Sequence, residues 1–218
     1  MTFPKTERNR VRRIPSRGHY DKDTVYEILD AGFLCHVGFV VEGQPFVIPT
    51  LYGRSGHSIY IHGSSASRML KVVAQGIDVC LTVTHVDGLV VARSAFHHSM
   101  NYRSVVVFGK ADEVSGPEKE EGLFAISESV IRGRWEEARA PYEKELKATS
   151  VLRVTVESAS AKVRTGPPGD EEEEDYALPI WAGVVPLRLA CGAIVDHPQL
   201  RAGIPVPTSV KQLTETAK

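Results

Sequence analysis

The stretch FVIPTLYGRSGHSIYIHGSSASRMLK, from Phe46 to Lys71, indicates the fold of the whole chain. The runs Phe46–Tyr52 and Ser58–His62 are rich in β-branched and aromatic residues, which favour strands. The turn residues Gly53-Arg54-Ser55-Gly56 separate them, so the stretch predicts a β-hairpin. The small residues from Gly63 to Ser67 come next, and a helix is expected directly after them.

The junction between this hairpin and its helix combines small residues, serine hydroxyls and two cations. Ser67 would cap the helix, whose first turn leaves backbone N–H groups without partners and favours an anion. Arg68 can bind two oxygens of an anion through its planar guanidinium, and Lys71 adds a point charge. The pattern indicates a phosphate group, and the alternative is a serine-capped surface helix with solvated charges. The chain lacks GxxxxGK[ST] and GxGxxG, which argues against a nucleoside triphosphate or a Rossmann site.

Composition excludes several classes of protein. The 218 residues are 42% hydrophobic with a net charge of −1, which is enough for one sizeable core but provides no global field for nucleic acid. No apolar run approaches the roughly 18 residues of a membrane span, and no apolar run follows the basic N-terminus as in a secretory signal. Three widely spaced cysteines predict buried, reduced thiols in a cytoplasmic protein: Cys35, Cys80 and Cys191.

The remaining chain is rich in short strands. Strands are expected at Phe33–Val41, Asp78–His85, Leu89–Ser94 and Arg103–Val114, with a long strand at Val151–Val163. About six strands at short spacing in the first half predict a closed or partly closed antiparallel barrel. Helices are expected from Asp21 or Asp23 to Asp30, from Ser67 to about Gly76, from Pro117 to Arg132 and from Pro141 to Ala148.

Three segments organise the chain. A basic arm spans residues 1–20, the barrel domain spans residues 21–207, and a C-terminal tail spans residues 208–218. The arm is expected either to be free or to lie along another surface, and the end of the chain is expected to be irregular. The acidic loop Thr165–Asp175 is interpreted as a solvated charge run.

Metal-dependent and hydrolytic chemistry have little support in the sequence. The adjacent His97 and His98 would face opposite sides of a strand, and no HExxH motif or cysteine pair accompanies them. A serine nucleophile is not indicated because the chain has no GxSxG elbow. No metal site is therefore expected.

A second polar cluster lies where a loop enters a strand. Asn101 offers a donor and an acceptor, Arg103 offers a planar fork, and Ser104 adds a hydroxyl. Together they could meet the polar edge of a heterocycle or its phosphate, although an ordinary loop-to-strand junction has the same composition.

Five segments in this order carry a resemblance: VIPTLYG, IYIHGSSASRMLK, FHHSMNYRSVVVFGKA, AKVRTGPPGDEEEED and LPIWAGVVPL. They resemble the pyridoxamine 5′-phosphate oxidase-like superfamily, and more closely its nitroimidazole-resistance-type, FMN-binding split-barrel branch. The resemblance spans about Arg12 to Pro207. It implies a mainly β fold, a six-stranded antiparallel split β-barrel with flanking helices, and a homodimer with FMN at the subunit interface.

The resemblance also implies roles for particular residues. Val47, Ile48, Pro49 and Thr50 would run along the isoalloxazine ring. The residues implied along the ribityl chain and at the phosphate are His62, Gly63, Ser64, Ser67, Arg68 and Lys71. Those implied to close and cover the site are Asn101, Arg103, Ser104 and Trp181, the last from the same subunit or from the other one.

The chain departs from the pyridoxamine phosphate oxidases at two motifs. Those enzymes carry a contiguous Ser-Arg-Lys triplet and an Arg-x-His near the C-terminus, whereas this chain has Ser67-Arg68-Met69-Leu70-Lys71 and no such Arg-x-His. The differences favour a flavoprotein reductase over vitamin B6 oxidation.

The expected function is an FMN-dependent oxidoreductase that passes electrons from a reduced nicotinamide to a small electron-poor acceptor. The flavin would carry the chemistry, so no indispensable acid–base side chain is expected, with His36 and His62 as the candidate exceptions. One alternative is a haem-binding or haem-degrading split barrel with His97 or His98 as axial ligand. Others are a non-catalytic flavin-binding module, a deazaflavin protein, or a structural dimer with an empty cleft.

Overall fold

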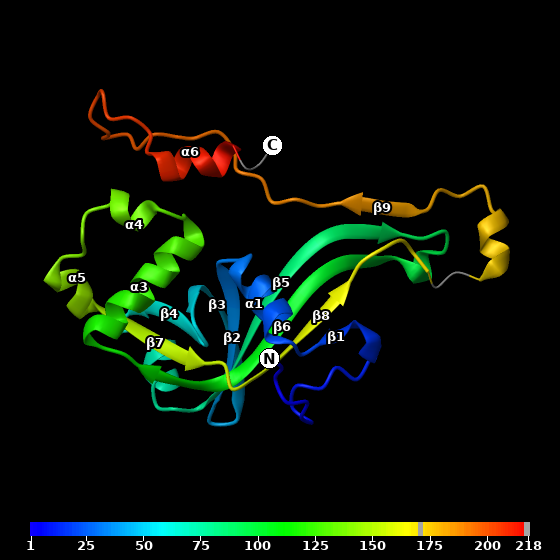
Figure 1. Cartoon of the computed structure of the whole chain (residues 1–218), viewed down its shortest axis with the longest axis horizontal. Helices are drawn as coiled ribbons and strands as arrows, with labels where there is room; N and C mark the ends of the chain where they lie inside the picture. The colour runs from blue at the N-terminus through cyan, green and yellow to red at the C-terminus, as the bar shows by residue number, and fades with distance from the viewer. Residues whose placement is uncertain (170–171, 216–218) are drawn as a thin grey trace.

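Six antiparallel strands close into a ring in the computed structural model, which describes residues 1–169 and 172–215 (Figure 1). The ring runs in the order β6-β7-β4-β3-β2-β5, and β5 pairs with β6 to close it. Its strands are β2 (Leu34–Val41), β3 (Gln44–Ser55), β4 (Ser58–Ser64), β5 (Asp78–Val91), β6 (Ser99–Glu113) and β7 (Thr149–Thr155). The expectation of a mainly β, six-stranded antiparallel fold is confirmed.

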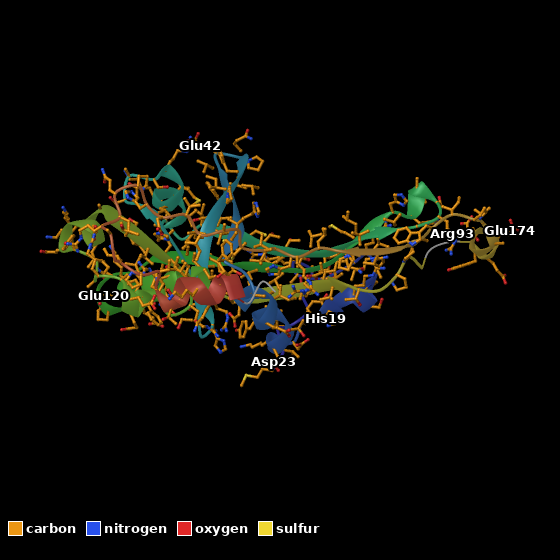
Figure 2. The ribbon with its side chains drawn as sticks, turned by 90° about the horizontal axis from the view of Figure 1, so that it is seen from above. His19, Asp23, Glu42, Arg93, Glu120 and Glu174 are labelled. Carbon is orange, nitrogen blue, oxygen red and sulfur yellow. The ribbon has the colours of Figure 1, made fainter. Side chains whose placement is uncertain are left out.

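The two longest strands extend beyond the ring as an arm (Figure 1). β5 and β6 pair from Asp78↔Lys110 to Val90↔Ser99, and β8 (Ser158–Arg164) pairs along β6. The short β1 (Gly18–His19) and β9 (Gly183–Pro186) add to the outer edges of β8 and β5. Figure 2 shows Arg93 and Glu174 at the far end of this arm.

Alternating positions of the ring strands fill its interior. The largest fully buried side chains include Tyr52, Ile59, Ile61, Leu81 and Leu152. Because successive residues of a strand face opposite sides, the intervening residues of β2 and β3 face outward. Apolar side chains exposed on that outer face are Leu34, Val40, Val47 and Leu51.

Helices cover the ends of the ring. α1 (Lys22–Asp30) begins after Asp21, whose carboxylate accepts from the backbone N–H of Thr24 at 2.8 Å, and it buries Val25, Ile28 and Leu29. The other helices are α2 (Arg68–Val73), α3 (Gly116–Val130), α4 (Arg134–Glu137), α5 (Glu143–Ala148) and α6 (Thr208–Glu215). Short 3₁₀ turns occur at Pro15–Arg17, Ala95–His97 and Glu173–Ala177. No helix in the described part of the chain is both long and apolar enough to cross a membrane.

Several expected boundaries were wrong. β3 continues through Gly53 to Ser55, so the hairpin turns at Gly56–His57, because α3 packs directly on this part of β3. The two strands expected at Asp78–His85 and Leu89–Ser94 form one strand, β5, with a bulge between Val86 and Gly88. The expected long strand Val151–Val163 is two strands, because β7 pairs with β4 whereas β8 pairs with the arm of β6.

The N-terminal arm lies along the surface of the fold, one of the two expected alternatives, and the C-terminal end is more ordered than expected. In the N-terminal arm Phe3 is buried, and Asn9 donates through Nδ2 to the carbonyl of Ala159 at 3.1 Å. The C-terminal segment returns across the molecule to α6, whose Ser209 bonds to Glu137 of α4 (Figure 1). Residues 170–171 of the acidic loop and 216–218 of the tail lie outside the described residues.

The cysteine prediction holds only in part. All three cysteines are free, and Cys35 is buried, where desolvation raises the pKa of its thiol to about 12. Cys80 is half-buried and Cys191 is exposed on the C-terminal segment, so burial does not explain all three.

Replacement of Gly53 by alanine should destabilise the protein. A Cβ at this position would lie 2.2 Å from the carbonyl carbon of Ala125 in α3, so the helix would have to move away from β3. We expect a loss of about 1–3 kcal/mol in the free energy of unfolding, the usual cost of overpacking. Chemical denaturation measures it.

Gly192→Ala is the matched control, because no atom lies within 4 Å of its added Cβ. It should change the free energy of unfolding by less than about 0.5 kcal/mol. Equal stability of the two variants would contradict the close approach of α3 to β3.

Candidate functional site

Strand β3 changes its hydrogen-bonding partner halfway along its length. From Gln44 to Leu51 it pairs with β2, whereas from Tyr52 to Ser55 it pairs with β4. Along its first half, therefore, the edge of β3 facing away from β2 has no strand partner among the described residues. Unpaired backbone N–H and C=O groups on such an edge are available to a ligand.

The same opening exposes the end of β4. β4 pairs with β3 only up to Ile61, although it stays paired with β7 up to Ser64. The edges of Val47–Leu51 and of His62–Ser64 thus bound a split in the ring. The structure brings Val47, Ile48, Pro49 and Thr50 to one side of this split and His62, Gly63 and Ser64 to the other.

The predicted phosphate residues lie where β4 leads into α2. The Ser67 hydroxyl accepts from the backbone N–H of Leu70 at 3.4 Å and caps the helix, as predicted. The Ser64 hydroxyl accepts from the N–H of Ala66 at 3.2 Å. Arg68 and Lys71 are exposed, and neither forms an ion pair with any carboxylate in the described residues.

Two further contacts shape this junction. The Arg68 guanidinium lies over the ring of Phe46, 4.8 Å from its centroid, which places the cation beside the start of β3. A Cβ at Gly63 would lie 3.1 Å from Cδ1 of Leu70, so a glycine allows α2 to close on β4. Phe46 was not among the predicted site residues, although its position at the start of the decisive stretch was a usable signal.

His62 is half-buried and lines an apolar cavity of about 360 Å³. Its Nδ1 is buried without a hydrogen-bond partner, and desolvation lowers the pKa of the imidazole, which keeps it neutral. The walls come from β3, the helical segment and the start of β7: Leu51, Leu123, Ile126, Ser127, Val130, Trp135, Pro141, Glu145, Leu146 and Thr149. Sequence reasoning missed this cavity because its walls come from three helices far along the chain.

The side chains of the second predicted cluster, Asn101, Arg103 and Ser104, form hydrogen bonds within the arm of β5, β6 and β8. Arg103 forms two hydrogen bonds with Asp87, at 2.9 and 3.0 Å, and this guanidinium lowers the pKa of the Asp87 carboxyl. Asn101 accepts from Arg164 at 2.6 Å, and Ser104 donates to the carbonyl of Lys162 at 3.3 Å.

These bonds hold the β5–β6–β8 arm together. Among the described residues, no hydrogen bond or ion pair joins Asn101, Arg103 or Ser104 to the Ser67–Lys71 segment. Trp181 is 64% exposed beside β9. The roles of these four residues at a cofactor stay predictions.

The remaining histidine candidates occupy different surroundings. His98 accepts from the backbone N–H of Ala92 at 3.3 Å at the exposed turn between β5 and β6. His97 packs edge-on against Phe96, which is itself 88% exposed. His36 is exposed on β2, opposite Pro49. No group of three or more His, Cys, Asp or Glu side chains within the described residues could hold a metal ion.

Comparisons with solved structures identify two similar chains of nearly the same length. The flavocytochrome Anf3 from Azotobacter vinelandii is 42% identical, with a TM-score of 0.88 over 95% of this chain and 97% of that one. The FAD and heme binding protein from Mycobacterium smegmatis is 38% identical, with a TM-score of 0.87 over 91% and 97%.

A third similarity shows the fold alone. The 5-nitroimidazole antibiotic resistance protein from Bacteroides thetaiotaomicron is 22% identical, with a TM-score of 0.58 over 67% of this chain and 86% of that one. No curated protein sequence matches the chain.

The sequence pattern of one family covers most of the ring. The match spans residues 21–163, from the start of α1 to the end of β8, and includes the β3–β4 hairpin and the start of α2. The chain therefore belongs to the pyridoxamine 5′-phosphate oxidase family.

Proposed function

We propose that the chain is a flavin-dependent redox protein that binds the flavin phosphate at the start of α2 and the isoalloxazine ring along β3. The observation that carries the proposal is the exposed pair Arg68 and Lys71, which has no carboxylate partner among the described residues, beside the unpaired edge of β3. The names of the two similar structures with 42% and 38% identity, a flavocytochrome and an FAD and heme binding protein, support it.

The protein's own residues would bind and orient the cofactor. Ser64, Arg68 and Lys71 supply hydroxyl and cationic groups for a phosphate. The backbone of Val47–Thr50 supplies N–H and C=O groups for the polar edge of the ring, except at Pro49, which has no N–H. A bound flavin supplies the hydride and electron chemistry, and the protein contributes position and polarity.

The identity of the flavin and its partners belongs to the proposal. FMN is the flavin that the sequence resemblance implies, and the name of the mycobacterial protein makes FAD the direct competitor. Reduced nicotinamide is the proposed electron donor, and a small electron-poor molecule is the proposed acceptor. The three free cysteines suit a reducing compartment, so the proposed location is the cytoplasm.

Haem is a second candidate cofactor, because the names of the Azotobacter and Mycobacterium structures described above include a cytochrome or heme. Of the ligands expected from the sequence, His98 is exposed and His97 is half-buried against the exposed ring of Phe96. A haem in addition to the flavin would make the chain a two-cofactor redox protein.

The first experiment is the visible absorption spectrum of the purified protein, followed by titration with FMN and with FAD. Flavin bands in a stoichiometric complex, bleached by reduced nicotinamide, would support the redox proposal. Uptake of neither flavin would overturn it.

Arg68→Ala should weaken flavin binding without unfolding the protein. The guanidinium is exposed and contacts only the face of Phe46 within the described residues, so the fold does not depend on it. Loss of a charged hydrogen bond to the phosphate should cost about 1.5–3 kcal/mol of binding free energy, roughly 10- to 150-fold in Kd. Flavin fluorescence titration measures the change.

Arg132→Ala is the matched control, because this exposed arginine follows α3 and lines a different cavity. It should leave the flavin Kd unchanged. If Arg68→Ala bound flavin as tightly as Arg132→Ala, the phosphate assignment would be wrong.

The exposed apolar face of β2 and β3 supports a homodimer. Leu34 is 46% exposed and pairs across the strands with Leu51, and Val47 further along is 67% exposed. We expect light scattering to give a mass of about twice 23.9 kDa for the native protein. Leu34→Asp should shift it toward the monomer, because a second copy would have to bury the carboxylate. A native monomer would contradict the homodimer.

A further inference from the structure

The C-terminal strap, residues 187–205, is exposed to solvent at every position. Both of its ends are attached to the body of the protein (Figure 1). On one side β9 pairs with β5, and the backbone N–H of Leu187 donates to the carbonyl of Asp87 at 3.0 Å. On the other side α6 is held by the bonds between Ser209 and Glu137. The strap is therefore fixed at both ends, whereas its middle is uncovered.

The strap is apolar, unlike an ordinary solvated loop. Its central run, Leu189–Val195 (LACGAIV), contains no charged, amide or hydroxyl side chain. The two ends of this run, Leu189 and Val195, are 89% and 88% exposed. The other large apolar side chains exposed on the strap are Leu187, Ile194, Leu200 and Ile204. A contiguous apolar surface of this kind on a folded protein marks an interaction site.

The middle of the strap has no polar partner within the described part of its own chain. Residues 188–196 take part in no hydrogen bond, ion pair or ring contact with any described residue. Fixing the backbone of one residue costs about 1–2 kcal/mol of conformational entropy, which favourable contacts have to offset. Contacts from outside the single chain are therefore needed to hold the strap in one conformation.

We propose that the strap lies on a second copy of the chain and closes over it as a clasp. The inference rests on the homodimer of the proposed function and adds the segment that binds the partner. The strap lies beyond residues 21–163, which match the family pattern, so the conserved ring does not account for it.

A second copy offers the uncharged surface that the strap needs. β2 from Leu34 to Val41 and β3 from Gln44 to Leu51 contain no Asp, Glu, Lys or Arg. Their outer face exposes Val40 and Val47 in addition to Leu34 and Leu51. One chain thus leaves two apolar surfaces uncovered, and in a twofold dimer every contact between them occurs twice. Removal of such surface from water is the main driving force for association.

A membrane is a less suitable occupant of the strap. Segments that lie on membranes are typically rich in Lys and Arg on their polar face, because they meet anionic lipids. The strap carries Arg188 and Arg201 beside Asp196, and the exposed Glu172–Glu174 precede β9. The charge around the strap therefore favours a protein surface over an anionic lipid surface.

Cys191 provides a reporter for the clasp. It lies in the central apolar run and is exposed in the single chain, whereas Cys35 is buried. Alkylation of the native protein with iodoacetamide, followed by peptide mass spectrometry, measures the reaction at each cysteine separately. A second copy on the strap should slow alkylation of Cys191 by about tenfold or more relative to the monomeric Leu34→Asp variant, because reaction would require transient release of the strap.

Leu189→Asp tests the strap directly. Its side chain is almost wholly exposed in the single chain, so the fold should remain intact by circular dichroism. In the dimer the new carboxylate would be buried. Light scattering should therefore show a shift toward the monomer, and Cys191 should become reactive. Val195→Asp is a second variant with the same expected result.

Leu189→Met is the matched control, because it keeps an apolar side chain of similar volume at the same position. It should stay dimeric with Cys191 protected. A Leu189→Asp variant as dimeric as Leu189→Met would overturn the clasp.

The alkylation results separate the clasp from the homodimer. A native dimer in which Cys191 reacts as fast as in the Leu34→Asp monomer would overturn the clasp and leave the homodimer intact. Protection of Cys191 that persists in this monomer would also overturn it, because the strap would then be covered by its own chain. Protection that appears only on vesicles of phosphatidylcholine and phosphatidylserine would overturn the second copy as the occupant.

Uptake of FMN or FAD separates the clasp from the flavin proposal. A native monomer that binds flavin would overturn the homodimer and the clasp together, and the flavin assignment would stand. Protection of Cys191 that is lost in Leu189→Asp, in a protein that takes up neither flavin, would support the clasp and overturn the flavin proposal.

Discussion

The change of partner along β3 is the constraint on which the site depends. β3 pairs with β2 along one edge and with β4 along the other, and the pairing with β4 begins only at Tyr52, where the pairing with β2 ends. Tyr52 fixes this point, since its buried ring packs in the core and its hydroxyl donates to the carbonyl of Leu29 in α1. Upstream of Tyr52 the strand edge is open, and downstream it is closed.

Helix α3 holds the closed half in place. Its backbone approaches β3 so closely that Gly53 has no room for a Cβ, and a Cβ at Gly122 of the helix would lie 2.7 Å from the Tyr60 ring and 2.9 Å from Val151. Glycines on both sides of the contact therefore let α3 lie close against β3, β4 and β7. The same helix supplies much of the wall of the His62 cavity, so the contact that closes the ring also forms the cavity.

Much of the fold follows from local patterns. The β-branched runs predicted the strands of the ring, and Asp21 and Ser67 predicted the helix starts, because these signals lie within a few residues of each other. The boundaries that failed depend on distant partners. Gly53 looked like a turn residue, but it is a strand residue that accommodates α3, about 70 residues later. The break between β7 and β8 likewise follows from their different neighbours in the sheet.

The residues of the candidate site likewise fall into two groups, those predictable from their sequence neighbours and those whose role depends on distant partners. Ser64, Ser67, Arg68 and Lys71 are neighbours in sequence, so their chemistry could be predicted from spacing alone. Arg103 had suitable chemistry for a phosphate, but Asp87 sits across the β5–β6 pairing and neutralises it.

The burial of His62 and the lowered pKa of its imidazole depend on distant residues. A histidine within an apolar strand gives no local sign of what covers it. Its walls arrive from α3, α4 and α5, between 60 and 90 residues further along the chain. Burial by those helices excludes water from the ring, which keeps the imidazole neutral and leaves its Nδ1 without a partner. A fold that needed only a packed wall there would be more stable with leucine, because a buried polar group without a partner carries a cost. The unpaired Nδ1 of His62 therefore lowers the stability of the fold, and the helices that bury it, rather than the residues next to it in sequence, set that cost.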